Sequence, residues 1–148
     1  MKFISIFSTK YNTNIFNFTL LFLRIFAGGF MLIHGFTKIN NFETISSTFP
    51  DPLHISTNIS LSLIIFAEVV CSFLIILGFF TRLATIPQIF GMIVAASVIN
   101  NPNSFLSIEL PFIYIILNII ILLLGAGKFS IDELLFSRKK IKLNVSKK

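Results

Sequence analysis

Charged residues are scarce in this chain of 148 residues. Asp, Glu, Lys and Arg together make up 12% of it, whereas hydrophobic residues make up 55% and the mean hydropathy is +0.90. Ordinary soluble domains contain about 25% charged residues. A chain with so little charge cannot cover a water-facing surface, so the composition favours a membrane protein with a single domain.

Cysteine is limited to Cys71, which lies inside an apolar run. A single cysteine excludes an internal disulfide and C-x-x-C dithiol chemistry, so we interpret Cys71 as a small packed side chain. The sequence also lacks an H-E-x-x-H motif, a glycine-rich nucleotide loop and a Walker motif. No metal site is therefore predicted, and no catalytic residue is identified.

Four apolar segments have the length of membrane-spanning helices, which need about 20 residues and tolerate about 17–25. Only helices and closed barrels satisfy the backbone in lipid, and these segments lack the alternation of strands. We therefore expect an all-α membrane protein, a bundle of four transmembrane helices. The predicted spans are residues 15–36, 59–80, 83–99 and 108–124.

The expected organisation is a cytoplasmic N-terminal segment (1–14), a four-helix membrane domain (15–135) and a basic cytoplasmic tail (136–148). Arg24 interrupts the first apolar run, so we expect a retained span rather than a cleaved signal peptide. The positive-inside rule places both termini in the cytoplasm, because ten Lys and Arg residues fall on their side and only Lys38 on the other. The ten are Lys2, Lys10, Arg82, Lys128 and the six Lys and Arg residues after Phe136.

Two ionisable residues lie within the predicted spans, Arg24 in the first and Glu68 in the second. Such residues usually face the interior of the bundle and often mark function. Each lies nine residues from the expected start of its span, so both are about 14 Å deep and near the midplane. We predict a buried Arg24–Glu68 pair joined by two parallel hydrogen bonds. Alternatively, each is satisfied separately by backbone carbonyls or water.

One face of the first span carries Arg24, Gly28, Met31, Gly35 and Lys38, spaced four, three, four and three residues apart. Glycines on such a face allow a neighbouring helix to approach closely, as small residues do in membrane interfaces. We therefore expect Gly28 and Gly35 to serve in helix packing.

A cluster of polar residues is expected at the outer ends of the spans. Its members are His34, Lys38, Asn100, Asn101 and Glu109. One hypothesis is a pocket that opens outward, with His34 as proton acceptor and Lys38 as a contact for an anion or headgroup. The other is an ordinary wet rim in which Lys38 snorkels to the interface.

The inner corner between the second and third spans contains Thr81 and Arg82. We expect Thr81 to cap the helix that follows it and Arg82 to hold phosphate headgroups. The basic tail is expected to determine topology and to have some affinity for anionic lipid.

Three stretches, "HGFTKI" at the end of the first span, "LGFFTRLAT" after Glu68 and "LLLGAGKFSIDELL" from the end of the fourth span, together resemble the DoxX family. The first span with Arg24 and the following "HGFTKI" is similar to the opening of that family, and "LGFFTRLAT" after Glu68 resembles its G-x-x-T-R-x-A corner. The closing "LLLGAGKFSIDELL" is similar to its G-x-G-x-x-S-x-D end. That last motif is matched by Gly125, Gly127, Ser130 and Asp132, and the whole resemblance covers about Leu20 to Leu135.

The resemblance implies an integral four-helix protein of the bacterial inner membrane. DoxX-like proteins include subunits linked to thiosulfate oxidation with quinone, and members associated with redox and thiol-stress systems. The resemblance also implies that five residues here match recurrent polar positions of the family. They are Arg24, His34, Lys38, Glu68 and Arg82.

From this resemblance we expect an accessory subunit of a membrane redox system, at most one subunit of an oxidoreductase complex. A quinone held near Arg24 and Glu68 is the candidate cofactor. The expected partners are the lipid bilayer and other proteins of the complex, and nucleic acid is not among them. Two alternatives stay open: a non-enzymatic assembly or interaction protein, and a carrier of small solutes or protons.

Overall fold

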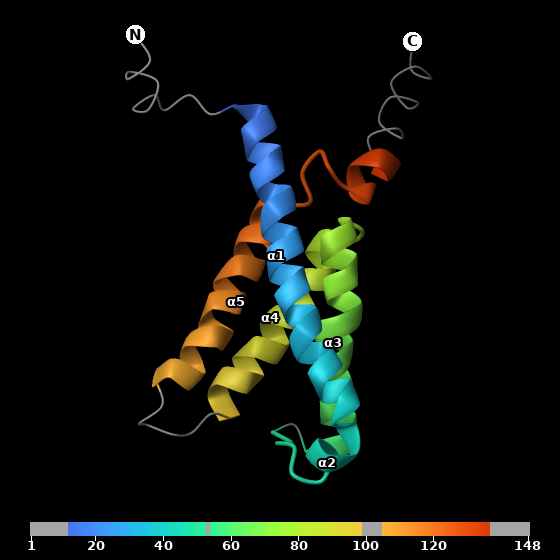
Figure 1. Ribbon diagram of the computed structural model, residues 1–148, viewed down its shortest axis with the longest axis vertical. Helices are drawn as coiled ribbons and strands as arrows, with labels where there is room; N and C mark the ends of the chain where they lie inside the picture. The colour runs from blue at the N-terminus through green and yellow to red at the C-terminus, as the bar shows by residue number, and fades with distance from the viewer. Residues whose placement is uncertain (1–11, 53, 99–104, 137–148) are drawn as a thin grey trace.

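The structure, a computed structural model, describes residues 12–52, 54–98 and 105–136, in which long helices run up and down beside one another (Figure 1). Every regular element in these ranges is helical, which confirms the all-α prediction. A short helical segment at 131–136 follows the last long helix. The helices are α1 (Thr13–Asn40), α2 (Phe42–Ser46), α3 (Thr57–Leu77), α4 (Thr81–Val98) and α5 (Phe105–Leu124).

The four long helices lie close to the predicted spans, but their ends differ. Helix α1 extends beyond the predicted 15–36 at both ends, and its first turn is capped by the side chain of Asn12, which accepts from the backbone N–H of Asn14 at 2.9 Å. Helix α3 stops at Leu77, short of the predicted residue 80, because Gly78 adopts a left-handed conformation with φ 70°. The predicted segments 1–14 and 136–148 lie almost wholly outside the described residues.

The turn after α3 reverses the chain within three residues. The N–H of Gly78 donates to the carbonyl of Ile75, and the N–H of Phe79 donates to the carbonyl of Leu74. This pair of bonds satisfies carbonyls that the end of a helix leaves without partners, and it requires a residue that tolerates positive φ. Helix α4 then begins at Thr81 and runs back along α3.

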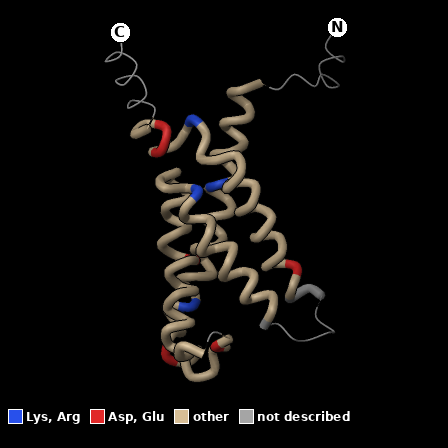
Figure 2. The backbone as a smooth tube through the Cα atoms, turned by 180° about the vertical axis from the view of Figure 1, so that it is seen from behind, with Lys and Arg blue, Asp and Glu red and all other residues tan. Residues whose placement is uncertain are grey.

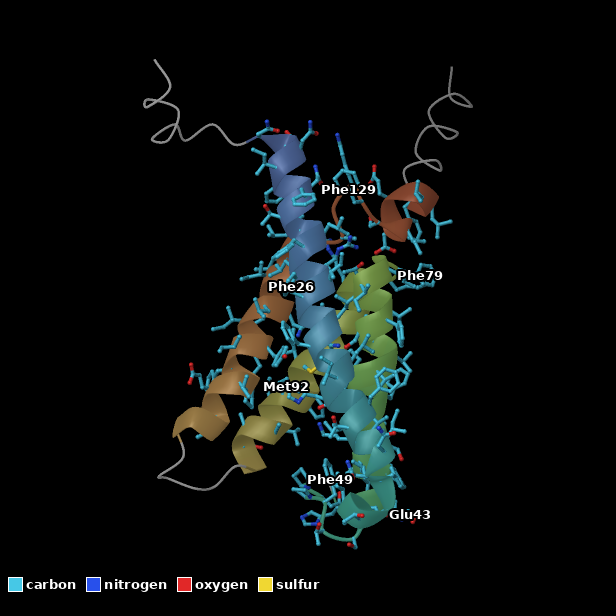
Figure 3. The ribbon with its side chains drawn as sticks, in the orientation of Figure 1. Phe26, Glu43, Phe49, Phe79, Met92 and Phe129 are labelled. Carbon is cyan, nitrogen blue, oxygen red and sulfur yellow. The ribbon has the colours of Figure 1, made fainter. Side chains whose placement is uncertain are left out.

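The bundle has two ends, which we name by their connections. At the corner end, α1 begins, α3 turns into α4, and α5 passes into residues 125–136, the closing segment (Figure 1). At the loop end, α1 passes through α2 and residues 47–56 into α3. Figure 3 shows Phe129 at the corner end and Phe49 at the loop end. Lys and Arg residues gather toward the corner end (Figure 2).

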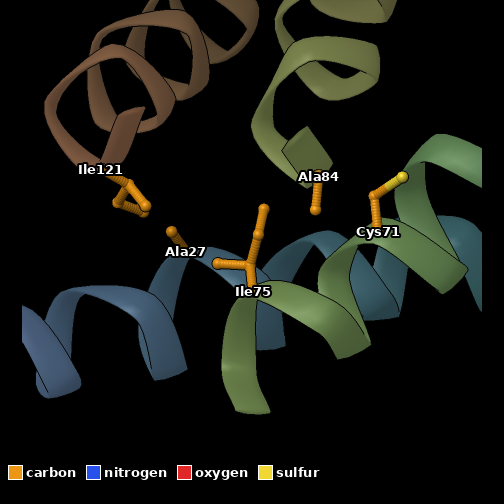
Figure 4. Close-up of a cluster of buried hydrophobic side chains, with 5 residues drawn as sticks. All are labelled: Ala27, Cys71, Ile75, Ala84 and Ile121. Carbon is orange, nitrogen blue, oxygen red and sulfur yellow. The ribbon is translucent and has the colours of Figure 1, made fainter. Parts of the chain in front are cut away.

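The helices pack mainly as two pairs, α1 on α3 and α4 on α5, and contacts between α3 and α4 join the pairs. All four long helices contribute to one buried apolar cluster (Figure 4). Cys71 is a free thiol within that cluster. The cluster consists of Ala27, Cys71, Ile75, Ala84 and Ile121.

The outside of the bundle is largely apolar. Large hydrophobic side chains are exposed along all four long helices, among them the ring series Phe22, Phe26 and Phe30 on α1. Charged and amide side chains such as Arg24 and Gln88 are buried instead. Such broad apolar exposure is unsuited to water and fits lipid as the surrounding solvent. Helices α1 and α3 each have the length and hydropathy to cross a membrane, and 108–124 is a shorter apolar stretch.

Close approach of α1 and α3 occurs at two glycines of the predicted stripe. A Cβ atom added to Gly28 would lie 2.6 Å from Cγ1 of Ile76 and 3.1 Å from the carbonyl oxygen of Ser72. A Cβ atom added to Gly35 would lie 2.5 Å from Cγ2 of Val69. The structure therefore places both glycines where any side chain would push the helices apart.

Neighbouring glycines on α1 provide a matched test of this contact. We predict that Gly28→Ala lowers the stability of the protein by about 1–3 kcal/mol, because the new methyl group overpacks the α1–α3 contact. Gly29→Ala is the control, since nothing lies within 4 Å of its added Cβ, and helix propensity favours alanine by up to about 1 kcal/mol. Thermal unfolding in detergent measures both, and equal effects of the two substitutions would contradict the prediction.

Candidate functional site

Glu68 of α3 pairs with Lys38 of α1. The Lys38 Nζ atom donates to both carboxylate oxygens of Glu68, at 2.7 Å each. The Glu68 side chain is only 4% exposed, whereas the Lys38 side chain is 25% exposed. The pair is therefore buried on the Glu68 side and open on the Lys38 side.

This pairing corrects the predicted contact between Arg24 and Glu68. The Arg24 guanidinium instead donates from Nη2 to the backbone carbonyl of Phe129 in the closing segment. In the part of the chain that the structure describes, no hydrogen bond or ion pair joins Arg24 to Glu68. The alternative, in which each group is satisfied separately, fits Arg24, because its partner is a backbone carbonyl.

The register of α1 against α3 explains the difference. Gly35 lies beside Glu68, whereas Nη1 of Arg24 lies beside Gly78, just beyond the end of α3. Arg24 and Gly35 are eleven residues apart, which is about 16 Å along a helix. The first residues of α1 extend in space beyond the corner end of α3. Counting residues from the first apolar position of each span therefore assigned Arg24 and Glu68 the same depth, although they lie at different levels of the bundle.

His34 and Tyr114 lie near the ion pair. Their ring centroids are 6.1 Å apart in an edge-to-face arrangement, and both groups interact electrostatically with Glu68. His34 is exposed and Tyr114 is 8% exposed. The aromatic partner Tyr114 was not among the predicted site residues, because nothing in its apolar run distinguishes it from a packing residue.

The remaining members of the predicted outer cluster do not join this group. Asn100 and Asn101 lie outside the described residues. Glu109 is exposed on α5, and no contact between it and Lys38 or His34 is found in the described ranges. The structure thus gathers His34 and Lys38 with Glu68, a residue that the prediction had assigned to a different pair.

Two adjoining cavities lie beside the ion pair at the loop end. One, of about 210 Å³, has Lys38 and Glu68 in its wall, and the other, of about 270 Å³, continues from it between α3 and α4. Apart from the ion pair, the wall of the first cavity is apolar. The residues common to both cavities are Phe49, Pro50, Ile64, Gly91 and Val94. The site is therefore an apolar slot with a charged pair at one end.

The loop over this slot is held by Asp51. Its carboxylate accepts from the hydroxyl of Ser60 at 2.8 Å and from the backbone N–H groups of Ile55 and Ser56. The Ser60 hydrogen bond is the main cause that lowers the pKa of Asp51, and the two backbone donors add to it against the opposing effect of desolvation. Asp51 thus ties the loop to the first turn of α3.

At the corner end, Asp132 of the closing segment caps α4. Its carboxylate accepts from the backbone N–H of Phe80 at 2.8 Å, and from both the backbone N–H and the hydroxyl of Thr81 at 3.0 Å. Its own N–H donates to the carbonyl of Gly78 at 2.8 Å. The predicted capping role of Thr81 is therefore corrected: Thr81 is the first residue of α4, and the cap comes from Asp132.

The closing segment also contacts α1 and leaves Arg82 exposed. The backbone N–H of Lys128 donates to Oδ1 of Asn17 at 2.9 Å, in addition to the bond between Arg24 and Phe129. Arg82 donates from Nη2 to the carbonyl of Leu123 at 3.3 Å. The closing segment, which the sequence singled out only by resemblance, thus joins α1, α3 and α4.

An apolar exterior around buried polar groups defines a small helical membrane protein. The chain belongs to the DoxX family, since the family model described as DoxX matches residues 19–101. The match covers Arg24, Lys38 and Glu68 and ends before the closing segment, although the expected resemblance extended to Leu135. A search of curated proteins and a search of solved structures find no match.

Replacement of the capping carboxylate tests the role of the closing segment. We predict that Asp132→Asn lowers stability by about 1.5–3 kcal/mol, because an amide cannot accept from all three donors that a carboxylate serves. Hydrogen exchange at the amides of Phe80 and Thr81 should accelerate together with a lower Tm. Glu133→Gln is the control, since this neighbouring side chain is exposed, and an equal effect there would contradict the prediction.

The loop over the slot should respond to acid. The folded protein lowers the pKa of Asp51 from its ordinary value of 3.8. The ionised carboxylate therefore stabilises the loop conformation of the folded protein above pH 3.8. This stabilisation is lost as the pH falls through the lower pKa of the folded state. We predict that protection of the Ile55 and Ser56 amides against hydrogen exchange decreases as the pH falls through this lower pKa. Asp51→Asn should show the low protection at neutral pH too, and unchanged protection in that variant would contradict the prediction.

Proposed function

We propose that this DoxX-family protein is the membrane subunit of a redox system and that it binds a quinone at the Lys38–Glu68 pair. The observation that supports the proposal is a buried ion pair at the end of an apolar slot. Binding sites for small molecules are typically apolar, with a few polar groups that fix orientation. An ionisable pair within a membrane bundle is also a usual mark of a functional site.

The proposal includes the arrangement in the membrane. All four long helices span the bacterial inner membrane, with the corner end and both termini in the cytoplasm. The distribution of charge supports this orientation, because Arg82 and Lys128 lie at the corner end and Lys38 lies toward the loop end. The slot then lies in the outer half of the bilayer.

The residues of the slot fit a quinone. The ammonium group of Lys38 has three N–H donors, and Glu68 accepts two of its hydrogen bonds. Among the described residues the third donor has no partner, so it can donate to a carbonyl oxygen of the bound molecule. The apolar walls formed by Phe49, Ile64 and Met92 suit an aromatic-sized ring and a hydrocarbon tail.

A quinone supplies an acceptor for two electrons and two protons, and the electron donor in this proposal is a partner protein that oxidises thiols or reduced sulfur. Glu68 holds Lys38 in position and can carry a proton on its carboxylate. His34, exposed and in ring contact with Tyr114, can pass protons between the site and water. The chain thus provides orientation and proton exchange, while the partner provides electrons.

Replacement of Glu68 tests the proposal. We predict that Glu68→Gln lowers the affinity of the purified full-length protein for a short-chain quinone by about tenfold or more, because loss of a charge-assisted pair costs about 1.5–3 kcal/mol. Quenching of intrinsic tyrosine fluorescence on titration with the quinone measures the affinity.

Glu109→Gln is the matched control, since it makes the same chemical change on exposed α5 and should leave the affinity unchanged. Wild-type protein that is purified without quinone and fails to bind added quinone would contradict the proposal. A stable protein partner recovered under those conditions would instead favour the interaction-protein hypothesis.

A further inference from the structure

We propose that a hollow at the corner end binds the phosphate group of an anionic membrane lipid. This site lies at the opposite end of the bundle from the Lys38–Glu68 slot and does not depend on the proposed quinone site. The hollow measures about 720 Å³ and lies between α1, the α3–α4 corner and the closing segment. It is therefore much larger than either loop-end cavity, at about 210 and 270 Å³.

Two cationic side chains line the hollow, and each has N–H groups that are not used in hydrogen bonds among the described residues. Arg82 uses one N–H in its 3.3 Å bond to the carbonyl of Leu123, and the Lys128 side chain has no hydrogen bond or ion pair among the described residues. Of the two carboxylates in the wall, Asp132 already accepts three hydrogen bonds from Phe80 and Thr81. The oxygens of Asp132 are therefore already occupied by the α4 cap.

The second observation is the state of Arg24, directly behind the wall. Its side chain is 0% exposed, and its Nε and Nη1 atoms have no hydrogen-bond partner in the described ranges. Arg24 follows Asn17 and Leu20 on one face of α1, and those two residues line the hollow. Its Nη1 atom and the lining residue Ser130 both lie against Gly78.

A buried guanidinium bound to a single carbonyl keeps most of its positive charge uncompensated. Asp132 is near enough to interact with it electrostatically, but no ion pair joins the two in the described part of the chain. Because a charge in a medium of low polarity acts over a longer range than in water, Arg24 strengthens the attraction of the hollow for an anion. Arg24, Arg82 and Lys128 together carry one more positive charge than the two carboxylates Asp132 and Glu133 carry negative charge.

The surroundings of the hollow favour a lipid over a soluble anion. Its wall includes large apolar side chains that are themselves exposed, among them Phe80 at 48%, Leu83 at 65% and Leu124 at 46%. These can contact acyl chains while Arg82 and Lys128 contact the phosphate. Basic pockets between membrane helices are known to bind anionic headgroups in this way.

Native mass spectrometry of the full-length protein in neutral detergent tests this proposal, with phosphatidylglycerol, phosphatidylcholine and inorganic phosphate as separate probes. We expect preferential binding of phosphatidylglycerol. Lys128→Gln should lower its affinity about fivefold and Arg82→Gln/Lys128→Gln about 25-fold, because each interfacial cation contributes about a factor of five. The single variant removes no hydrogen bond found within the described residues, so it also covers the case in which the double variant fails to fold.

The matched control is Lys147→Gln/Lys148→Gln, which removes the same net charge from the end of the sequence. An equal loss of affinity in this control would mean that overall charge attracts the lipid, and it would overturn the proposal. Equal binding of phosphatidylglycerol and phosphatidylcholine would also overturn it. Binding of inorganic phosphate as tight as that of the lipid would show a site for a small anion and would overturn the assignment to a lipid.

Discussion

The close approach of α1 and α3 determines where the buried charges of this protein lie. Gly28 and Gly35 have no side chain to separate the helices, so the backbone of α1 lies against Ser72 and Glu68 of α3. In that register Lys38 reaches Glu68. Because α1 is one continuous helix, the same register places Arg24 beside Gly78 at the end of α3. Its hydrogen-bond partner there is the carbonyl of Phe129 in the closing segment.

Within the described residues, buried charges are paired at one end of the bundle and left unpaired at the other. At the loop end, Lys38 and Glu68 neutralise each other beside an apolar slot. At the corner end, the Asp132 carboxylate accepts from the backbone N–H groups of Phe80 and Thr81 and from the Thr81 hydroxyl, and no carboxylate in the described ranges pairs with Arg24. The first end is balanced and the second is positive, which is why the ligands proposed for the two ends differ in charge.

Much of the fold could be predicted from the sequence, because apolar runs of this length in lipid leave little choice other than helices. The pairing of charges could not, because the register between two helices depends on where each ends and how closely they pack. The first residues of α1 extend past the end of α3 at Gly78, so Arg24 lies beside Gly78 rather than level with Glu68. The role of Asp132 was equally hidden, since it caps a helix that begins 51 residues earlier in the chain.

Contacts other than the Lys38–Glu68 pair also pack α1 against α3. The glycine contacts and the apolar cluster around Ile75 already bury that interface, and buried ion pairs often contribute no more stability than apolar residues of the same size. A pair that serves only packing would also be closed off, whereas the Lys38 side chain remains 25% exposed and lines the slot. Burial of the carboxylate with exposure of the ammonium group instead suits a site that presents a positive donor to a bound molecule, with Glu68 holding that donor in place.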